Sequence, residues 1–369
     1  MKYVDEFRDV DITKKLINKI YKKFEGRDIN KRVNIMEVCG THTMSIYKNG
    51  IDKLLPKNIN LLSGPGCPVC VTDTSYVDSA IDLSKNKNII ICTFSDMLRV
   101  LGSKSSLSNE KLNGSNIVSI YSPLDCIYIA NKNKEKEVIF LGVGFETTIP
   151  IIGLTIKKAY ESNINNFSLL SSLKTMPNAM KKLILDPKAY IDGFICPGHV
   201  GSVIGTDDFD KLARENNMPM VMAGFEHVDI VYAIYSLCEM IENKEYKCKN
   251  QYKRAVRDNG NKLAKNVINE VFEITNSNWR GLGNIKDTGL KIKEKYKQFD
   301  AIYKFKLNIE ESNHINGCLC GEVLRGVKKP TQCKLFKSKC TPLNPIGPCM
   351  VSQEGTCANF YRYVLEDNI

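Results

Sequence analysis

Residues 138–143 read Val138-Ile139-Phe140-Leu141-Gly142-Val143, an apolar run that ends in the turn Gly144-Phe145. A continuous apolar run of this length is typical of a strand that is buried on both faces of a parallel sheet. Six further runs of this kind alternate with stretches of helical pattern: Val33 to Val38, Lys87 to Phe94, Asn116 to Tyr121, Phe167 to Leu170, Gly193 to Cys196 and Met220 to Ala223. The alternation predicts an α/β fold with parallel sheets covered by helices.

The spacing of these runs suggests two βαβ units in tandem within the 369 residues. Ser122-Pro123 interrupts the pattern, so we expect one Rossmann-like α/β domain over residues 31–124 and a second over 125–228. An amphipathic helix is expected over residues 11–24, with Asp11 as its N-cap. After about residue 227 helical spacing replaces the strands. Residues 1–30 and 229–369 are therefore expected to form a third, helical and cysteine-rich domain.

Composition indicates a globular protein, since 43% of the residues are hydrophobic. No stretch reaches the roughly 18 to 20 apolar residues of a membrane span. The first residues, Met1 to Glu6, lack the apolar region of a signal peptide, so we expect a cytoplasmic location. In that compartment the 14 cysteines are better interpreted as ligands, redox groups or core thiols than as disulfides. Cys92, Cys126 and Cys238 lie in apolar stretches and are expected to be buried core residues.

The net charge of +11 is concentrated in residues 243–306, which hold 16 Lys or Arg against 7 Asp or Glu. Such a segment is compatible with a nucleic acid or an acidic partner protein. Aromatic residues for base stacking are not clustered there, which favours ordinary solvated helix faces.

Five cysteines lie close together in the tail, and four of them, Cys320, Cys333, Cys340 and Cys357, fit the spacing C-x12-C-x6-C-x16-C. The intervening residues are rich in turn formers, and a loop-rich segment with so many thiols normally needs a metal. Wide separations favour an iron-sulfur cluster over zinc, which commonly uses closely paired cysteines. Cys349, or Cys318 close before Cys320, remains an alternative ligand.

A second thiol motif is Cys67-Pro68-Val69-Cys70, expected at the start of a helix capped by Asp73. The helix dipole there would lower a thiol pKa and make the pair reactive. A C-x-x-C can also be half of a zinc site, but no second C-x-x-C or matching histidine pair stands nearby. We therefore favour a redox pair.

A third group of candidates follows the predicted strand ends, where loops of parallel sheets form ligand sites. Cys39 stands beside Thr41 and His42, and an imidazole can generate a thiolate that acts as a nucleophile or binds a soft metal. Glu146, His199 and Glu226 each adjoin a glycine turn, and together they are candidate proton-transfer groups in a common cleft.

Two site classes are disfavoured. Gly142-Val143-Gly144 lacks the third glycine of the dinucleotide fingerprint and no Walker motif is present, which argues against nucleotide binding. The compact C-x3-C-x2-C of radical S-adenosylmethionine enzymes is also absent, which argues against radical chemistry.

Taken together, these motifs resemble the HypD family of [NiFe]-hydrogenase maturation factors over nearly the whole chain. The resemblance is carried by the strings Glu37-Val38-Cys39-Gly40-Thr41-His42-Thr43, Gly64-Pro65-Gly66-Cys67-Pro68-Val69-Cys70-Val71-Thr72, Gly144-Phe145-Glu146-Thr147-Thr148, Cys196-Pro197-Gly198-His199-Val200, Cys320-Gly321-Glu322-Val323-Leu324, Cys340-Thr341-Pro342, Cys349-Met350-Val351-Ser352 and Glu354-Gly355-Thr356-Cys357. Gly201 before Ser202 and Gln353 in the tail depart from the pattern, and neither is a proposed ligand.

The resemblance implies a scaffold and redox protein that assembles the Fe(CN)2CO group of the hydrogenase active site with the partner HypC, and that receives cyanide from HypE. It implies two Rossmann-like domains around a cleft and a third domain with a [4Fe-4S] cluster held by Cys320, Cys333, Cys340 and Cys357. Cys39 would ligate the iron, with His42 beside it, and Cys67 and Cys70 would exchange electrons with the cluster. The hydrogenase large subunit would be reached indirectly through HypC, without nucleic acid or membrane.

Two alternatives belong to other functional classes. One is a stand-alone thiol-disulfide or cluster-dependent reductase, which would not depend on partner proteins. The other is an iron-sulfur enzyme that acts on nucleic acid through the basic segment. Salt-dependent binding of DNA would distinguish the latter.

Overall fold

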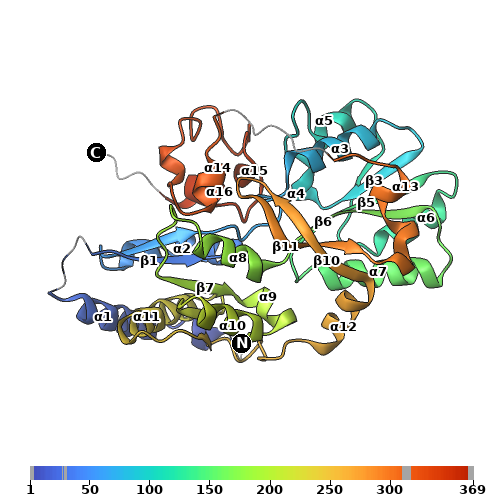
Figure 1. The fold of residues 1–369 in the computed structure, drawn as a ribbon. Helices are drawn as coiled ribbons and strands as arrows, with labels where there is room; N and C mark the ends of the chain where they lie inside the picture. The colour runs from blue at the N-terminus through green and yellow to red at the C-terminus, as the bar shows by residue number, and fades with distance from the viewer. Residues whose placement is uncertain (1–3, 27, 29–30, 310–316, 365–369) are drawn as a thin grey trace.

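The computed structural model describes residues 4–26, 28, 31–309 and 317–364. Two parallel sheets, an antiparallel hairpin and a cysteine-rich tail with short helices make up the described chain (Figure 1). The predicted α/β class with parallel sheets is therefore confirmed.

The first sheet has the strand order β2-β1-β7-β8-β9. Its strands are β1 (Val33–Glu37), β2 (Ile59–Ser63), β7 (Gly193–Pro197), β8 (Met220–Ala223) and β9 (Cys248–Asn250). All neighbours are parallel, with Ile35 of β1 opposite Leu61 of β2 on one side and Gly193 of β7 on the other. From β1 the chain continues to β2 on one side of that strand, and it later adds β7 on the other side. The loops after β1 and β7 therefore lie where the strand order reverses, which is where parallel sheets commonly bind ligands.

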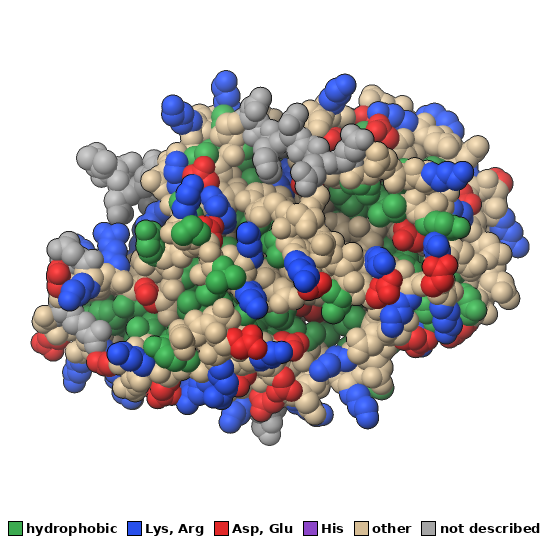
Figure 2. All heavy atoms as spheres, in the orientation of Figure 1, with side chains coloured by type: hydrophobic (Ala, Val, Ile, Leu, Met, Phe, Trp, Pro, Cys, Tyr) green, Lys and Arg blue, Asp and Glu red, His purple; other side chains and the backbone are tan. Residues whose placement is uncertain are grey.

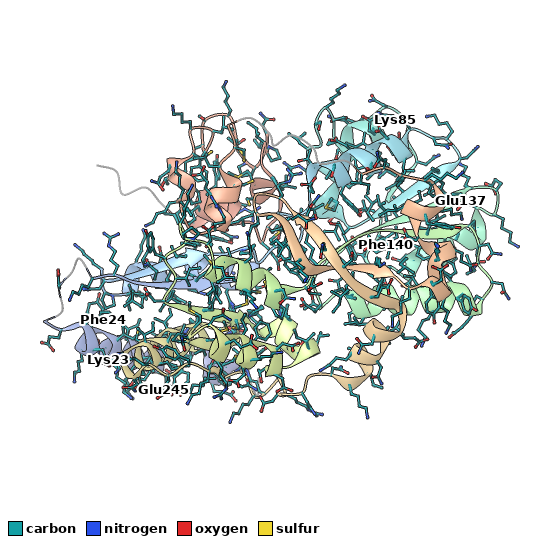
Figure 3. All side chains as sticks on the ribbon, viewed as in Figure 1. Lys23, Phe24, Lys85, Glu137, Phe140 and Glu245 are labelled. Atoms are coloured by element: carbon teal, nitrogen blue, oxygen red, sulfur yellow. The ribbon has the colours of Figure 1, made fainter. Side chains whose placement is uncertain are left out.

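The second sheet has the order β4-β3-β5-β6 and is also parallel. Its strands are β3 (Ile89–Thr93), β4 (Ile117–Ser119), β5 (Glu137–Gly144) and β6 (Phe167–Leu173). The decisive run, Val138 to Val143, is the central part of β5, and every residue in it is buried. Phe140 projects into the core of this sheet (Figure 3), where its ring meets that of Phe94 edge-on at 5.5 Å.

The sheets do not follow one another along the chain, and the expected tandem division at residues 124 and 125 is wrong. The chain leaves the first sheet after β2, builds the whole second sheet, and returns at β7. The expected boundary falls between β4 and the following helix, inside the second sheet. Apolar runs identify buried strands but carry no information on which strands pair, because the pairing is set by contacts far apart in sequence.

Helices cover both faces of the first sheet. On one face α1 packs against α11, beside α2, and on the other lie α8, α9 and α10. Their bounds are α1 (Val10–Phe24), α2 (Gly40–Lys48), α8 (Met176–Ile184), α9 (Gly198–Ile204), α10 (Asp207–Glu215) and α11 (His227–Asn243). The expected N-cap Asp11 is wrong, because the carboxylate of Asp9 accepts the N–H groups of Asp11 and Ile12. Figure 3 shows Lys23 and Phe24 at the end of α1.

The second sheet is covered by α3 and α5 on one face and by α6 and α7 on the other. These helices span α3 (Thr74–Ser84), α5 (Leu107–Leu112), α6 (Asp125–Lys132) and α7 (Ile149–Glu161), with the short α4 (Ser95–Leu98) after β3. Cys92 and Cys126 are fully buried here, and Cys238 is buried under the first sheet. All three are core residues, as expected.

The region after α11 is less helical than expected. It contains β9, α12 (Lys262–Val271) and a long antiparallel hairpin of β10 (Phe272–Trp279) and β11 (Gly283–Ile292). Figure 1 shows the hairpin running across the molecule from α12 toward the tail. It is followed by η3 (Glu294–Phe299) and α13 (Ala301–Lys304). The sequence did not indicate the hairpin, because polar residues interrupt its strands and leave no continuous apolar run.

The tail, residues 317–364, packs against the first sheet and contains α14 (Cys320–Leu324), η4 (Pro330–Gln332), α15 (Pro348–Val351) and α16 (Thr356–Tyr363). Two further short helices, η1 (Asp5–Phe7) and η2 (Ile51–Leu54), belong to the first half of the chain. Helix α16 packs on α2, with the rings of Phe360 and Tyr47 4.5 Å apart. The tail therefore reaches the loop that carries Cys39.

The surface drawn in Figure 2 has basic and acidic side chains interspersed. Several lysines of the basic segment are paired with carboxylates, as in Lys291 with Glu273 at 2.9 Å and Lys304 with Glu137 at 2.7 Å. This supports the interpretation of the segment as ordinary solvated surface. Within the described residues, no helix combines the length and the apolarity that crossing a bilayer requires.

Candidate functional site

The first candidate thiol, Cys39, lies between β1 and α2. It is the N-cap residue of α2, and its side chain is buried at 7% exposure. Burial raises the pKa of this thiol to about 12, and the negative charges of Glu354 and Glu37 act in the same direction. The site therefore holds Cys39 as a neutral thiol, and not as the thiolate that the sequence suggested.

Two carboxyl groups flank Cys39. Glu37 accepts the backbone N–H of Cys39 at 3.0 Å and the hydroxyl of Thr43 at 2.5 Å. Burial raises the pKa of Glu37 to about 7. Glu354, from the tail, accepts the hydroxyl of Thr41 at 3.1 Å, and burial raises the pKa of Glu354 as well. These are suitable acceptors for the proton that Cys39 must lose before its sulfur can bind a metal.

Glu354 is the residue that sequence reasoning missed. A Cβ at Gly40 would lie 2.4 Å from the Cβ of Glu354, so only glycine allows the tail to approach this closely. Thr41, a predicted site residue, thereby acquires a defined role, because it binds the tail carboxylate. The only sequence signal was the place of Glu354 in the string before Cys357.

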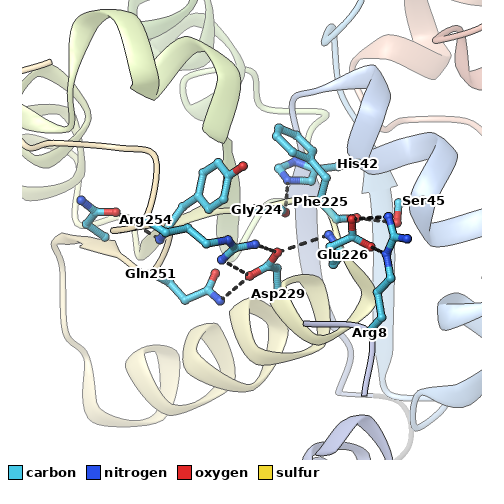
Figure 4. A network of polar contacts seen from close by, with 11 residues as sticks. Arg8, His42, Ser45, Gly224, Phe225, Glu226, Asp229, Gln251 and Arg254 are labelled. Carbon is cyan, nitrogen blue, oxygen red and sulfur yellow. Dashed lines mark hydrogen bonds and ion pairs between the residues drawn. The ribbon is translucent and has the colours of Figure 1, made fainter. Parts of the chain in front are cut away.

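The imidazole of His42, three residues after Cys39, is held by the loop after β8. Its Nε2 lies 2.8 Å from the carbonyl of Gly224, which can only accept, so Nε2 carries the proton (Figure 4). Its Nδ1 is buried and has no hydrogen-bond partner in the described structure. Burial lowers the pKa of His42 to about 4. The ring is therefore neutral, with a free acceptor nitrogen at Nδ1.

Phe225 joins two of the predicted histidines in one stack. Its ring lies 4.7 Å from that of His42 and 3.9 Å from that of His199. Burial lowers the pKa of His199. The stack brings together the loops after β1, β7 and β8, at the predicted ligand edge of the first sheet.

Glu226 is not part of this stack. Its carboxylate forms two bonds with Arg8, at 2.7 and 2.8 Å, and it caps α11 (Figure 4). The hydrogen bond from Arg8 lowers the pKa of Glu226. The neighbouring Asp229 is fully buried and paired with Arg254. Glu226 therefore anchors the N-terminal segment, and its position offers no proton to Cys39.

Glu146 lies at a separate place, after β5 of the second sheet. One oxygen accepts the N–H of Met176 at 2.7 Å, and the other is buried without a partner in the described structure. Burial raises the pKa of Glu146 to about 7. The group lines a cavity of about 450 Å³ together with Lys181, Asp208 and Lys265, and with none of the cysteines. The expectation of one common cleft for Glu146, His199 and Glu226 is therefore wrong.

The C-x-x-C motif forms a turn between β2 and α3. Asp73 does cap α3, as predicted, but the helix begins at Thr74, so the two thiols precede its first turn. Both thiols are buried, and Cys67 accepts the N–H of Cys70 at 3.3 Å. Burial is the main cause that raises the pKa of Cys70, so the expected lowering by the helix dipole does not apply to it.

The turn with the C-x-x-C is in direct contact with Cys39. The N–H of Gly40 donates to the carbonyl of Gly66 at 3.3 Å. A Cβ at Gly66 would lie 2.3 Å from the backbone nitrogen of Cys39, so glycine is required there. The glycines of both strings thus allow the two thiol loops to pack backbone to backbone.

On its other side the C-x-x-C contacts the tail. The thiol of Cys70 donates to the carbonyl of Pro348 at 3.8 Å, and it lies close to the thiol of Cys349. Cys349 in turn lies close to Cys320 and Cys357, with which it shares the wall of one cavity. Cys349 therefore connects the predicted redox pair to the predicted metal ligands.

The tail thiols surround one small cavity. Its wall includes all four predicted ligands and both alternative ones: Cys318, Cys320, Cys333, Cys340, Cys349 and Cys357. The N–H of Ile346 donates to the sulfur of Cys340 at 3.3 Å, and apolar side chains such as Leu335 complete the wall. Sulfur donors in an apolar enclosure suit an iron-sulfur cluster or zinc. Among the described residues, however, no three His, Cys, Asp or Glu side chains stand together so that they could hold one metal ion as they are.

Comparison with known proteins gives matches over nearly the full length. The family model of HypD, described as the hydrogenase formation hypA family, matches residues 11–364. The chain is 41% identical over 371 residues to hydrogenase maturation factor HypD2 of Bradyrhizobium diazoefficiens, covering 98% of this chain and 97% of that protein. It is 40% identical to HypD of Cupriavidus necator over 371 residues, covering 98% and 97%. With HypD of Escherichia coli the identity is 38% over 366 residues, covering 98% of both chains.

Among solved structures, the ligand-free, open form of CD0873, a substrate binding protein from Clostridium difficile, aligns with a TM-score of 0.13 at 13% identity. The alignment covers 60% of this chain and 89% of that chain. This similarity is too low to bear on fold or function.

Proposed function

The chain belongs to the HypD family and is a hydrogenase maturation factor, and we propose that it is the scaffold on which the Fe(CN)2CO group of a [NiFe]-hydrogenase is assembled. In this proposal it works in the cytoplasm in a complex with HypC and receives cyanide from HypE. The iron group is its cargo, passed on through HypC to the hydrogenase large subunit. The proposal is carried by one observation, the continuous contact of three thiol groups.

The contact runs from Cys39, through the backbone pair Gly40 and Gly66, to the C-x-x-C turn, and from Cys70 through Cys349 to the tail thiols. Groups that exchange electrons need such short paths. An assembly scaffold that only held iron would not need a buried dithiol between its iron site and a second sulfur site.

Cys39 is the proposed ligand of the iron cargo. Cyanide and carbon monoxide favour electron-rich, low-spin iron, and a soft thiolate suits such a centre. Because burial keeps Cys39 protonated, binding of the iron must displace its proton. The proposed acceptors are Glu37, which accepts the backbone N–H of Cys39, and Glu354, which accepts the hydroxyl of Thr41. The free Nδ1 of His42 is available to accept a hydrogen bond from a ligand in the same region.

Cys67 and Cys70 are the proposed redox pair. When both thiols are oxidised to a disulfide, one S–S bond forms and two electrons and two protons are released. A [4Fe-4S] cluster held by Cys320, Cys333, Cys340 and Cys357 would exchange single electrons when bound. Cys349 lies between these groups and is the proposed contact for electron exchange.

The remaining candidates, His199, Glu146 and Glu226, are assigned no part in proton or electron transfer. His199 shapes the edge of the iron site through its stack with Phe225. Glu146 and Glu226 are assigned no proton transfer at Cys39, because one lines a separate cavity and the other is paired with Arg8.

The alternative of a stand-alone reductase uses the same pair, since contact between Cys70 and Cys349 would serve any thiol-disulfide exchange that involves a cluster. The two functions differ in their dependence on partners. Iron with cyanide should accumulate on the chain only when HypC and HypE are produced with it. Equal loading without them, or thiol-disulfide turnover with no iron cargo under either condition, would favour the reductase.

A further inference from the structure

Arg280 is a buried cation for which the described part of the chain offers no anion. Its side chain is 3% exposed, and its Nε donates to the carbonyl of Thr72 at 2.8 Å. One terminal nitrogen, Nη2, is buried without a hydrogen-bond partner in the described structure. No carboxylate among the described residues forms an ion pair with it.

An isolated charge in this position is costly. A guanidinium stays protonated in proteins, so it cannot escape burial by losing its charge. Removal of a charge from water is unfavourable in proteins unless an opposite charge and hydrogen bonds compensate for it. A single carbonyl acceptor is therefore an incomplete set of partners for the Arg280 side chain.

Arg280 lies between two of the thiol groups. It lies at the end of the hairpin β10–β11, where its N–H donates to the carbonyl of Val71 at 2.9 Å. The next residue, Gly281, packs on Gly321, so closely that a Cβ on it would lie 2.3 Å from the Cα of Gly321. The hairpin tip is thus held between the C-x-x-C turn and the helix that carries Cys320.

The pocket at this point has a volume of about 220 Å³ and is lined by Arg280, Cys318 and Cys320. Two other charged groups in its wall already have partners. Arg325 is paired with Asp186 at 3.1 Å, and Glu322 with Lys328 at 3.3 Å. Among the described residues, Arg280 is therefore the uncompensated charge in this wall. Cys318 and Cys320, in the same wall, become anions when they bind a metal.

We propose that Arg280 is the fixed counter-charge of the thiolate-bound metal centre in the tail, and that it sets the reduction potential of that centre. The proposal rests on the proposed function, in which the tail holds a [4Fe-4S] cluster. A cluster with four thiolate ligands is anionic and becomes more negative when it is reduced, and its potential depends on net charge and on hydrogen bonds to sulfur. A buried cation beside it stabilises the reduced state more than the oxidised state, and so raises the potential.

Arg280 has a structural role in addition to its charge. Through its bonds to Val71 and Thr72, Arg280 also fixes the distance between the centre and the redox pair. It is a positioning residue, since it is not itself a ligand.

The experiment is a spectroelectrochemical titration of the anaerobically purified full chain, followed by the visible absorbance of the cluster, with iron and sulfide assayed in each sample. R280M removes the charge and keeps much of the side-chain volume. R280K keeps the charge. R362Q, on the exposed side of α16, removes a positive charge elsewhere in the tail and is the matched control.

We expect R280M to shift the midpoint potential to more negative values, and R280K and R362Q to remain close to the unsubstituted chain. An unchanged potential in a fully loaded R280M overturns the proposal, as does an equal negative shift in R280K. If R280M loses the cluster, retention in R280K supports a charge requirement, and loss in both overturns it. An unsubstituted chain without iron and sulfide would overturn the cluster itself, and with it this proposal.

Discussion

The thiol of Cys70 lies next to that of Cys349, and this contact joins the C-x-x-C turn to the cysteine-rich tail. Cys349 also contacts Cys320 and Cys357, so it belongs to both thiol groups at once. This contact makes the tail part of one continuous thiol site with the first half of the chain.

Replacement of Cys349 by alanine tests this connection. We expect iron and sulfide to stay near the level of the unsubstituted chain, because four ligands remain, but electron exchange between the cluster and the Cys67–Cys70 pair to slow by about tenfold or more, as when a packed redox contact is lost. Stopped-flow absorbance after addition of a dithiol measures the exchange. Cys92→Ala, which also removes a fully buried thiol, is the control. Complete loss of iron in Cys349→Ala would identify Cys349 as a ligand instead.

Replacement of Cys340 by serine should remove the cluster and destabilise the tail, because metal binding there is coupled to folding. Iron content should fall to near background, and the tail should become susceptible to proteolysis. The half-buried Cys248 of β9, also changed to serine, provides the comparison. An unchanged iron content would show that Cys340 is not a ligand, and Cys333→Ser would be examined in the same way.

Replacement of Glu354 by glutamine should lower the pKa of Cys39. The carboxylate is one of the causes that raise this pKa to about 12, after burial itself. An amide oxygen can still accept the hydroxyl of Thr41, so the loop is expected to keep its shape. A decrease of about one pKa unit would increase alkylation of Cys39 roughly tenfold at fixed pH. Mass spectrometry of the labelled peptide measures the rate, with the exposed Glu161→Gln as control, and equal rates would contradict the prediction.

The pH dependence of stability should report on Glu146. Burial raises its pKa from 4.5 to about 7, so the folded state binds this proton more tightly than the unfolded state. The contribution is fully present below pH 4.5 and is lost as pH rises to about 7 and beyond. Glu146→Gln removes this titration. Between pH 4.5 and 8 the unsubstituted chain should therefore lose up to about 3 kcal/mol more of its free energy of unfolding than the variant does.

Urea unfolding at the two pH values measures this difference, and Glu135→Gln, on an exposed residue, is the control. Parallel pH profiles of Glu146→Gln and the unsubstituted chain would show that Glu146 is not titrating in this range. Glu37 has a similarly raised pKa and remains in both proteins, so the profile of the variant should be shallower but not flat.

The sequence predicted the strands well because buried parallel strands have a simple signature. All seven runs that were identified are strands in the structure. The hairpin β10–β11 has no such signature, since Glu273, Asn276 and Asn278 interrupt its apolar residues. The pairing of β1 with β7 was also hidden, because it depends on packing between segments more than 150 residues apart.

The site was predictable in its residue types and less so in its electrostatics. Cysteine spacing indicated the three thiol groups, and glycines beside them indicated turns. Glu354 and Thr41 are 313 residues apart in the sequence, and no local pattern predicts their contact. The expectation of reactive thiolates failed for the same reason, since local sequence shows a nearby histidine or helix start but not the burial that raises the pKa of Cys39 and Cys70.

The central claim is that Cys39 holds iron that carries cyanide and carbon monoxide, and the most direct test is an infrared spectrum of the anaerobically purified chain co-produced with HypC and HypE. The account predicts bands of both ligands in the unsubstituted chain, and their loss in Cys39→Ala with the tail cluster still present. Bands that persist in Cys39→Ala, or their absence from an unsubstituted chain with an intact cluster, would contradict it.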